Sequence, residues 1–253
     1  MSQPIYDQID DFFVNVVRDA MQRPTSLLAR ITQFQLAMMG DVEGQHILDL
    51  CCGDGHLSIE LVKHGASVVG VDISQVNLSA AKTQAAGQGL IEDNPTFMLD
   101  NAQLLAQQND AQFDIVVCKM ALMDIPDIDA AFRAVQRVLK PDGRFFAALL
   151  HPCFETPFTM PHETVETDEQ GNFKHHRVQR YFEEGIWHSG GTGIRGHVGA
   201  HHRKLSTYIN SLLAAGFQLI RMEEPPLDVD EPGSLSGQWH HQISKVLYIE
   251  AKS

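Results

Sequence analysis

The sequence predicts an α/β fold built on a mostly parallel, doubly wound sheet. From residue 46 onward, short apolar runs alternate with segments of helical periodicity, which is the pattern of successive βαβ units. A turn containing two glycines follows the first run, and an acid closes each of the first three runs, at Asp49, Asp72 and Asp100. Right-handed crossovers place these acids at one edge of the sheet, where such folds bind ligands.

The expected strands lie at residues 46–51, 67–71, 96–99, 113–118, 143–150, 217–222 and 245–251. Helices are expected at residues 55–64, 74–86, 127–139 and 205–215. Ser74 is a candidate N-cap, and Gly216 is expected to end the last helix.

The chain is predicted to form a single domain, residues 1–253, with four parts. Residues 1–40 read as a helical cap, in which Thr25 or Ser26 begins the second helix. Residues 41–150 form the core and residues 203–253 complete the sheet. Residues 151–202 are too long for an ordinary connection, and they hold eight of the thirteen histidines and several aromatic residues, which favours an ordered lid.

The composition of the chain argues against several classes of binding partner. The formal net charge is −13, with 19 basic against 32 acidic residues, which argues against nucleic acid and anionic membranes as partners. No apolar stretch is long enough to span a membrane, and the N-terminus lacks a secretory pattern. The four cysteines are expected as thiols in a reducing cytoplasm. None of the lid histidines shows the spacing of a metal site, so no metal is predicted.

The turn at residues 49–55 (Asp-Leu-Cys-Cys-Gly-Asp-Gly) follows the first strand directly. Its glycines allow a ligand to approach the backbone. A dinucleotide site would carry a third glycine for the pyrophosphate, which this turn lacks. The carboxylate of Asp49 is better suited to a cationic amino-acid ligand, and that of Asp72, after the second strand, to the hydroxyls of a ribose.

These motifs resemble class I S-adenosylmethionine-dependent methyltransferases of the small-molecule branch. The resemblance covers residues 46–150 well and includes Leu-Lys-Pro-Asp-Gly at residues 139–143. It implies a Rossmann-like, seven-stranded sheet whose last strand runs antiparallel between the fifth and sixth. It also implies S-adenosyl-L-methionine as the cofactor. Cys51 stands where the family usually has its first glycine.

The resemblance implies a role for each matching residue. Asp49, Cys51 and the turn formed by Gly53 and Gly55 would hold the methionine moiety. The remaining cofactor-binding residues would be Asp72 at the ribose, Ile73 on the adenine, Asp100 at the adenine amino group with backbone help from Asn101 and Ala102, and Lys119 and Met120 at the methionine end.

The acceptor side is less determined. His151, after the fifth strand, is the candidate general base, or else a structural histidine bonded to the lid. Arg203 would bind an acidic substrate group or form a salt bridge that caps the lid, and the salt bridge is favoured. Tyr181 and Trp187 would form an aromatic wall for the acceptor or the core of the lid. Tyr6 and Arg23 would close over the cofactor or pack helices.

The predicted function is methyl transfer to an O, N or C atom of a small molecule. Two alternatives stay open at this point: an NAD-dependent oxidoreductase on a similar sheet, and a family member that holds the cofactor without methylating. A small-molecule acceptor is the expected partner, and a homodimer is left open.

Overall fold

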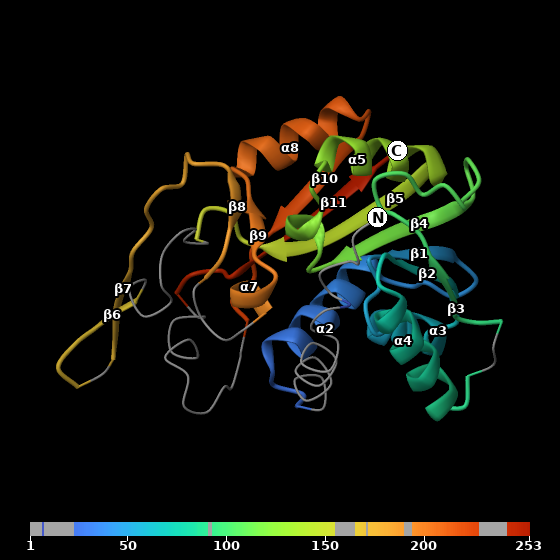
Figure 1. Ribbon diagram of the computed structural model, residues 1–253, viewed down its shortest axis with the longest axis horizontal. Coiled ribbons are helices and arrows are strands. Elements are labelled where there is room, and N and C mark those ends of the chain that lie inside the picture. Colours follow the sequence, from blue (N-terminus) through green and yellow to red (C-terminus); the bar gives the residue numbers. More distant parts are fainter. Residues whose placement is uncertain are drawn as a thin grey trace.

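The computed structural model describes residues 7, 23–90, 93–154, 165–170, 172–189, 194–227 and 242–253. Its centre is a seven-stranded sheet with the order β10-β11-β5-β4-β1-β2-β3 (Figure 1). The strands are β1 (His46–Leu50), β2 (Ser67–Asp72), β3 (Thr96–Leu99), β4 (Phe113–Lys119), β5 (Leu139–Leu150), β10 (Gln218–Glu223) and β11 (Val246–Lys252).

Strands β1 to β5 pair in parallel, and β11 runs antiparallel to both β5 and β10. The Rossmann-like, seven-stranded fold with an antiparallel last strand is thus confirmed. The chain reverses its direction of winding at β1, which has β2 on one side and β4 on the other. This reversal leaves a crevice at the carboxyl ends of the strands, where folds of this kind bind ligands.

Helices cover both faces of the sheet (Figure 1). One face carries α2 (Leu27–Met39), α3 (His56–Lys63) and α4 (Gln75–Gly87), and the other carries α5 (Ile128–Val138) and α8 (Leu205–Ala214). Side chains alternate along β1, so that Leu48 and Leu50 pack with the α5 side while Ile47 packs with the α2 and α3 side.

The helix ends follow the residue types at their caps. The Ser26 side chain accepts a hydrogen bond from the backbone N–H of Ala29 at the start of α2. The Ser74 side chain accepts one from the backbone N–H of Asn77 at the start of α4. Gly40 ends α2 with a left-handed φ of 73°. The expected caps at Ser26 and Ser74 are therefore confirmed.

One strand differs clearly from its predicted range. β5 begins at Leu139, four residues before the expected start at residue 143, because the chain already pairs with β4 through Phe113 and Leu139. The Lys-Pro-Asp-Gly segment is absorbed as an irregularity in the strand, with a shift of register between Phe113 and Ile115. The other strand ends agree with the prediction to within one residue.

The described part of residues 151–202, the segment predicted to form a lid, consists of short elements. Strands β6 (Val165–Thr167) and β7 (Phe173–His176) form a hairpin that projects away from the main sheet (Figure 1). Strands β8 (Gly185–Trp187) and β9 (Ala200–His202) form a second hairpin, and helix α7 (Ile194–His197) lies between them in the chain. None of the described helices combines the length and apolar character that a membrane span requires.

Candidate functional site

The turn after β1 is held in a left-handed backbone conformation at three alternate positions, with φ of 58° at Cys51, 56° at Gly53 and 78° at Gly55. Glycine adopts such values freely, whereas other residues do so at a cost. A Cβ atom at Gly55 would lie 2.7 Å from Cζ of Phe97 and 2.8 Å from Cβ of Ala81. Gly55 is therefore required both by its φ and by the packing of α3 against β3 and α4.

Cys51 keeps the backbone of the turn although it replaces a glycine. Its thiol is hydrogen-bonded with that of Cys118, and this contact, together with burial, raises the pKa of Cys51 well above the usual value. The thiol is therefore protonated and acts as a small filler between β1 and β4. All four cysteines are free, as the sequence predicts.

Asp49, near the end of β1, is buried with 1% of its surface exposed. The hydroxyl of Ser58, on α3, donates to its carboxylate at 2.6 Å. Burial raises the pKa of Asp49 to about 6, although the hydrogen bond from Ser58 and the charge of Lys119 act in the opposite direction. A cationic ligand group beside Asp49 would stabilise the charged form of this buried carboxylate.

Lys119 ends β4, on the strand next to Asp49. Its ammonium donates to the hydroxyl of Thr32, on α2, at 3.1 Å. Removal from water lowers the pKa of Lys119, while the charge of Asp49 raises it. Within the described part of the chain no carboxylate oxygen lies within ion-pair distance of this ammonium. The site thus offers a negative and a positive group that are close but not joined, which suits a zwitterionic amino-acid moiety.

Asp72 ends β2 and shapes the same turn. Its carboxylate accepts hydrogen bonds at 2.9 Å from the backbone N–H groups of Gly53 and Ser74. The Ser74 hydroxyl donates in turn to the carboxylate of Asp7. Burial raises the pKa of Asp72. Ile73, the next residue, is 50% exposed, which leaves its apolar side chain available to a ligand.

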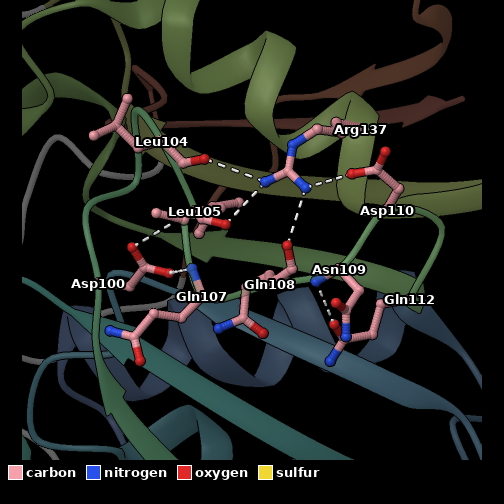
Figure 2. Close-up of polar contacts among 10 residues, drawn as sticks. Asp100, Leu104, Leu105, Gln107, Gln108, Asn109, Asp110, Gln112 and Arg137 are labelled. Atoms are coloured by element: carbon pink, nitrogen blue, oxygen red, sulfur yellow. Dashed lines mark hydrogen bonds and ion pairs between the residues drawn. The ribbon is translucent and has the colours of Figure 1, made fainter.

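Asp100 follows β3 and organises the loop that comes after it (Figure 2). Its carboxylate accepts from the backbone N–H groups of Asn101 at 2.8 Å, Ala106 at 3.1 Å and Gln107 at 3.0 Å. Both oxygens thus accept hydrogen bonds from the protein, as the two oxygens of Asp72 also do. The direct contact with an adenine amino group stays a prediction, and the observed role of Asp100 is to fix the loop.

The same loop exposes an apolar residue that the sequence pattern does not mark. Leu104 is 62% exposed, whereas Ala102 is buried in the core. An exposed leucine is common on protein surfaces and carries no signal by itself. Its position in the loop that follows β3 is what makes it a candidate site residue.

His151 follows β5 at the carboxyl edge, and both of its ring nitrogens are engaged. The Nδ1 atom accepts a hydrogen bond from the backbone N–H of Cys153 at 3.2 Å, so the neutral ring carries its proton on Nε2. Nε2 contacts the carboxylate of Glu224. The imidazole is buried, whereas the Glu224 side chain is 54% exposed. The accessible side of this pair is therefore the carboxylate.

Trp187 and Tyr181 have different positions in the lid. Trp187 is buried and lines a cavity of about 20 Å³ between the lid and the ends of β4 and β5; the other lining residues are Met123, Leu150, Pro152, Ala200, His201, His202, Arg203 and Tyr208. Tyr181 accepts a hydrogen bond on its hydroxyl from the backbone N–H of Leu205 at 2.9 Å. Tyr181 thus ties the lid to the start of α8.

Arg203 is buried and donates to the backbone carbonyl oxygens of Ile125 at 2.6 Å, Pro126 at 2.7 Å and Leu122 at 3.4 Å. The favoured prediction of a salt bridge is wrong, since no carboxylate among the described residues pairs with Arg203. The carbonyl groups that follow β4 satisfy the guanidinium instead. Arg195, which lies nearby in the chain, does pair with a carboxylate, that of Asp124.

Two predicted residues belong to the N-terminal segment. Arg23 is exposed, and its carbonyl accepts a hydrogen bond from the N–H of Ser26 at 2.9 Å. Tyr6 lies outside the described residues.

Met120, after Lys119, has a left-handed φ of 58° and packs partly against the core. Among the residues the structure describes, no group of three or more potential metal ligands comes together.

Fold and site together define a class of protein: a Rossmann-like domain whose strand ends suit a nucleoside that bears a charged amino-acid group. A family model described as "Methyltransferase domain" matches residues 41–186. The chain belongs to this family. It is an S-adenosylmethionine-dependent methyltransferase, and S-adenosylmethionine is its cofactor.

Several proteins resemble the chain along its length. An uncharacterized protein of Haemophilus influenzae is 27% identical over 98% of this chain and 96% of its own. A structure from Listeria monocytogenes, assigned to the S-adenosylmethionine-dependent methyltransferases, is 28% identical with a TM-score of 0.71, and it covers 89% of this chain and 98% of that one.

Other relatives show where the likeness ends. Ubiquinone biosynthesis O-methyltransferase of Coxiella burnetii is 32% identical, but the match covers only 53% of this chain and 55% of that enzyme. The [4+2]-cyclase SpnF shares the fold with a TM-score of 0.63 at 18% identity, covering 100% of this chain and 98% of that one. The fold by itself therefore does not fix the reaction.

Proposed function

We propose that this enzyme methylates an O, N or C atom of a small metabolite bound between the strand ends and the lid. The observation that carries the proposal is the packing of the β8–β9 hairpin against the segments that follow β4 and β5, with a cavity of about 20 Å³ beside Trp187. A recessed, largely apolar site of this kind suits a small acceptor better than a macromolecule. The acidic net charge supports the same choice.

The residues at the strand ends fit the cofactor. Asp49 would attract the ammonium group of the methionine moiety and Lys119 its carboxylate, since Asp49 is buried, Lys119 is half-buried, and neither is paired with the other. Asp72 would accept the ribose hydroxyls, and Ile73 and Leu104 would pack on the adenine. The bound cofactor supplies an electrophilic methyl group on sulfur. The protein's own contribution is then to orient the acceptor and exclude water.

For the acceptor side we propose that His151 and Glu224 act together. With Nδ1 of His151 committed to the backbone of Cys153, the buried imidazole orients the Glu224 carboxylate through Nε2. The exposed carboxylate oxygen is then the group able to take a proton from a hydroxyl or ammonium acceptor. For His151 itself to serve as the predicted base, its proton would have to move from Nε2 to Nδ1, and the ring would have to give up its contacts with both Glu224 and the backbone of Cys153.

The acceptor class is tested by following a trideuterated methyl group from S-adenosylmethionine into a cell extract separated into small molecules, RNA and protein. The proposal expects the label in the small-molecule fraction. Label confined to RNA or protein would contradict it.

Variants test the two residues. His151→Ala and Glu224→Gln are both expected to lower kcat about a hundredfold with a hydroxyl or ammonium acceptor, the usual size of a lost general base. The binding of S-adenosylhomocysteine should stay unchanged. Glu223→Gln is the matched control, because Glu223 pairs with Arg221 rather than with His151. Undiminished turnover in both variants would remove the pair from the mechanism.

A further inference from the structure

The loop between β3 and β4, residues 100–112, carries the surface expected to meet adenine, yet it contains neither helix nor strand. Two of its non-glycine residues, Leu105 and Ala111, adopt left-handed φ values of 46° and 51°. Each such residue costs roughly 1–2 kcal/mol. A loop of this kind keeps one shape only when contacts from outside hold it there.

One set of contacts acts on the amide groups. The Asp100 carboxylate accepts from three backbone N–H groups, those of Asn101, Ala106 and Gln107. The loop is thereby folded around a negative charge at its start. Within the loop, the carbonyl oxygen of Leu105 accepts from the N–H of Gln108 at 3.0 Å, whereas the carbonyl oxygens of Leu104 and Gln108 accept no backbone hydrogen bond from the described residues.

The carbonyl groups are held by a single arginine from α5 (Figure 2). The Arg137 guanidinium donates to the carbonyl oxygens of Leu104 at 3.2 Å, Leu105 at 2.8 Å and Gln108 at 3.0 Å, and to the carboxylate of Asp110 at 2.6 Å. Its planar fork serves all four acceptors at once, which a lysine ammonium does not.

The helix that carries Arg137 is itself fixed to the core. Phe132, Val135 and Val138 on α5 are buried against the sheet. At the other end of the helix, the side chain of Gln103, in the loop, accepts a hydrogen bond from the backbone N–H of Asp127 at 2.7 Å. The loop is thus tied to both ends of α5.

We infer that Arg137 is a positioning residue for the cofactor: by holding the carbonyl groups of Leu104, Leu105 and Gln108, it fixes the loop in the shape that receives the adenine ring. The inference rests on the placement of adenine beside this loop that is proposed above. Arg137 touches no ligand in this account. It acts through the backbone of Asn101 to Leu104.

The test compares Arg137→Lys with wild type by calorimetric binding of two ligands. These are S-adenosylhomocysteine and S-inosylhomocysteine, which has an oxygen in place of the adenine amino group. If the loop of the variant holds its binding shape about one-tenth of the time, the Kd for S-adenosylhomocysteine rises about tenfold. The wild type should prefer S-adenosylhomocysteine, and the variant should lose most of that preference.

The matched control is Arg133→Lys. Arg133 lies one turn earlier on α5, is exposed, and has no hydrogen bond to the described residues. It should bind both ligands like wild type. Amide hydrogen exchange at Ala106 and Gln107 gives a second readout, expected to be faster in Arg137→Lys only. This readout still reports on the loop if the variant binds no ligand.

The outcomes separate the two claims. An unchanged Kd and unchanged exchange in a folded Arg137→Lys variant would overturn the role of Arg137. Equal losses for both ligands would also overturn it, since they would show a general effect on the fold. A wild type that binds S-adenosylhomocysteine with no preference over S-inosylhomocysteine would refute the placement of adenine beside the loop. A wild type that binds neither ligand would refute the cofactor site itself.

Discussion

Replacement of Gly55 by alanine adds one methyl group where the turn after β1 enters α3. The residue has a φ of 78°, which an L-amino acid adopts at a cost of roughly 1–2 kcal/mol. The new Cβ would lie 2.7 Å from Cζ of Phe97 and 2.8 Å from Cβ of Ala81, closer than Cβ contacts are normally found. Relieving that overlap costs a further ~1–3 kcal/mol. The free energy of unfolding should therefore fall by about 2–5 kcal/mol.

The assay is urea unfolding followed by circular dichroism, with Gly87→Ala as control. Gly87 lies in the last turn of α4, and a Cβ there would have no neighbour within 4 Å. The control should be stabilised by about 0.5–1 kcal/mol, because alanine favours the helix. A Gly55→Ala variant whose free energy of unfolding falls by less than ~1 kcal/mol would refute the packing argument.

Three further predictions concern charged residues. Burial raises the pKa of Asp49 from 3.8 to about 6, so the protonated carboxyl group stabilises the fold below pH 3.8, and this contribution is lost as the pH rises to about 6. In urea titrations, the free energy of unfolding of Asp49→Asn should therefore gain up to ~3 kcal/mol relative to that of the wild type between pH 3.8 and 7. Lys119→Met should weaken the binding of S-adenosylhomocysteine at least about tenfold in calorimetry, but leave the binding of 5′-methylthioadenosine, which lacks the amino acid, unaffected. Equal losses of affinity for both ligands would contradict the assigned role. Lys82→Met, on the exposed surface of α4, is the control. Arg203→Met should lower the free energy of unfolding by about 2–4 kcal/mol, because it strands buried carbonyl groups, and a smaller change would show that water replaces the guanidinium.

The sequence determines much of the sheet because each strand has its own local signal. Apolar runs bounded by glycine or by cap residues predicted β1 to β4 to within one residue, and Ser26 and Ser74 marked two helix starts. The start of β5 could not be read in this way. Lys140 to Gly143 has the composition of a turn, and only pairing with β4 draws it into the strand.

The site was predictable where its residues follow strands directly. Asp49, Asp72 and Asp100 lie at strand ends, as their positions in the sequence indicate. The carboxylates also serve the protein itself: Asp72 and Asp100 accept hydrogen bonds from backbone amides of the loops beside them. Such bonds depend on the exact path of the loop, which residue patterns do not specify.

Contacts between segments that are far apart in the chain could not be predicted from the sequence. His151 and Glu224 are 73 positions apart, and Arg203 reaches carbonyl groups 77 to 81 positions earlier. A lone glutamate or arginine in a sequence does not reveal its partner, and for Arg203 a carboxylate was the natural expectation. Arg137 reads as an ordinary basic residue at the end of a helix until its acceptors are seen.

The most direct test of the account is a crystal structure with S-adenosylhomocysteine bound. The account predicts the amino group of the ligand at Asp49, its carboxylate at Lys119 and the ribose hydroxyls at Asp72, with adenine beside Ile73 and Leu104. A ligand whose amino-acid end lies away from Lys119, or whose adenine makes no contact with the loop of residues 100–112, would contradict it.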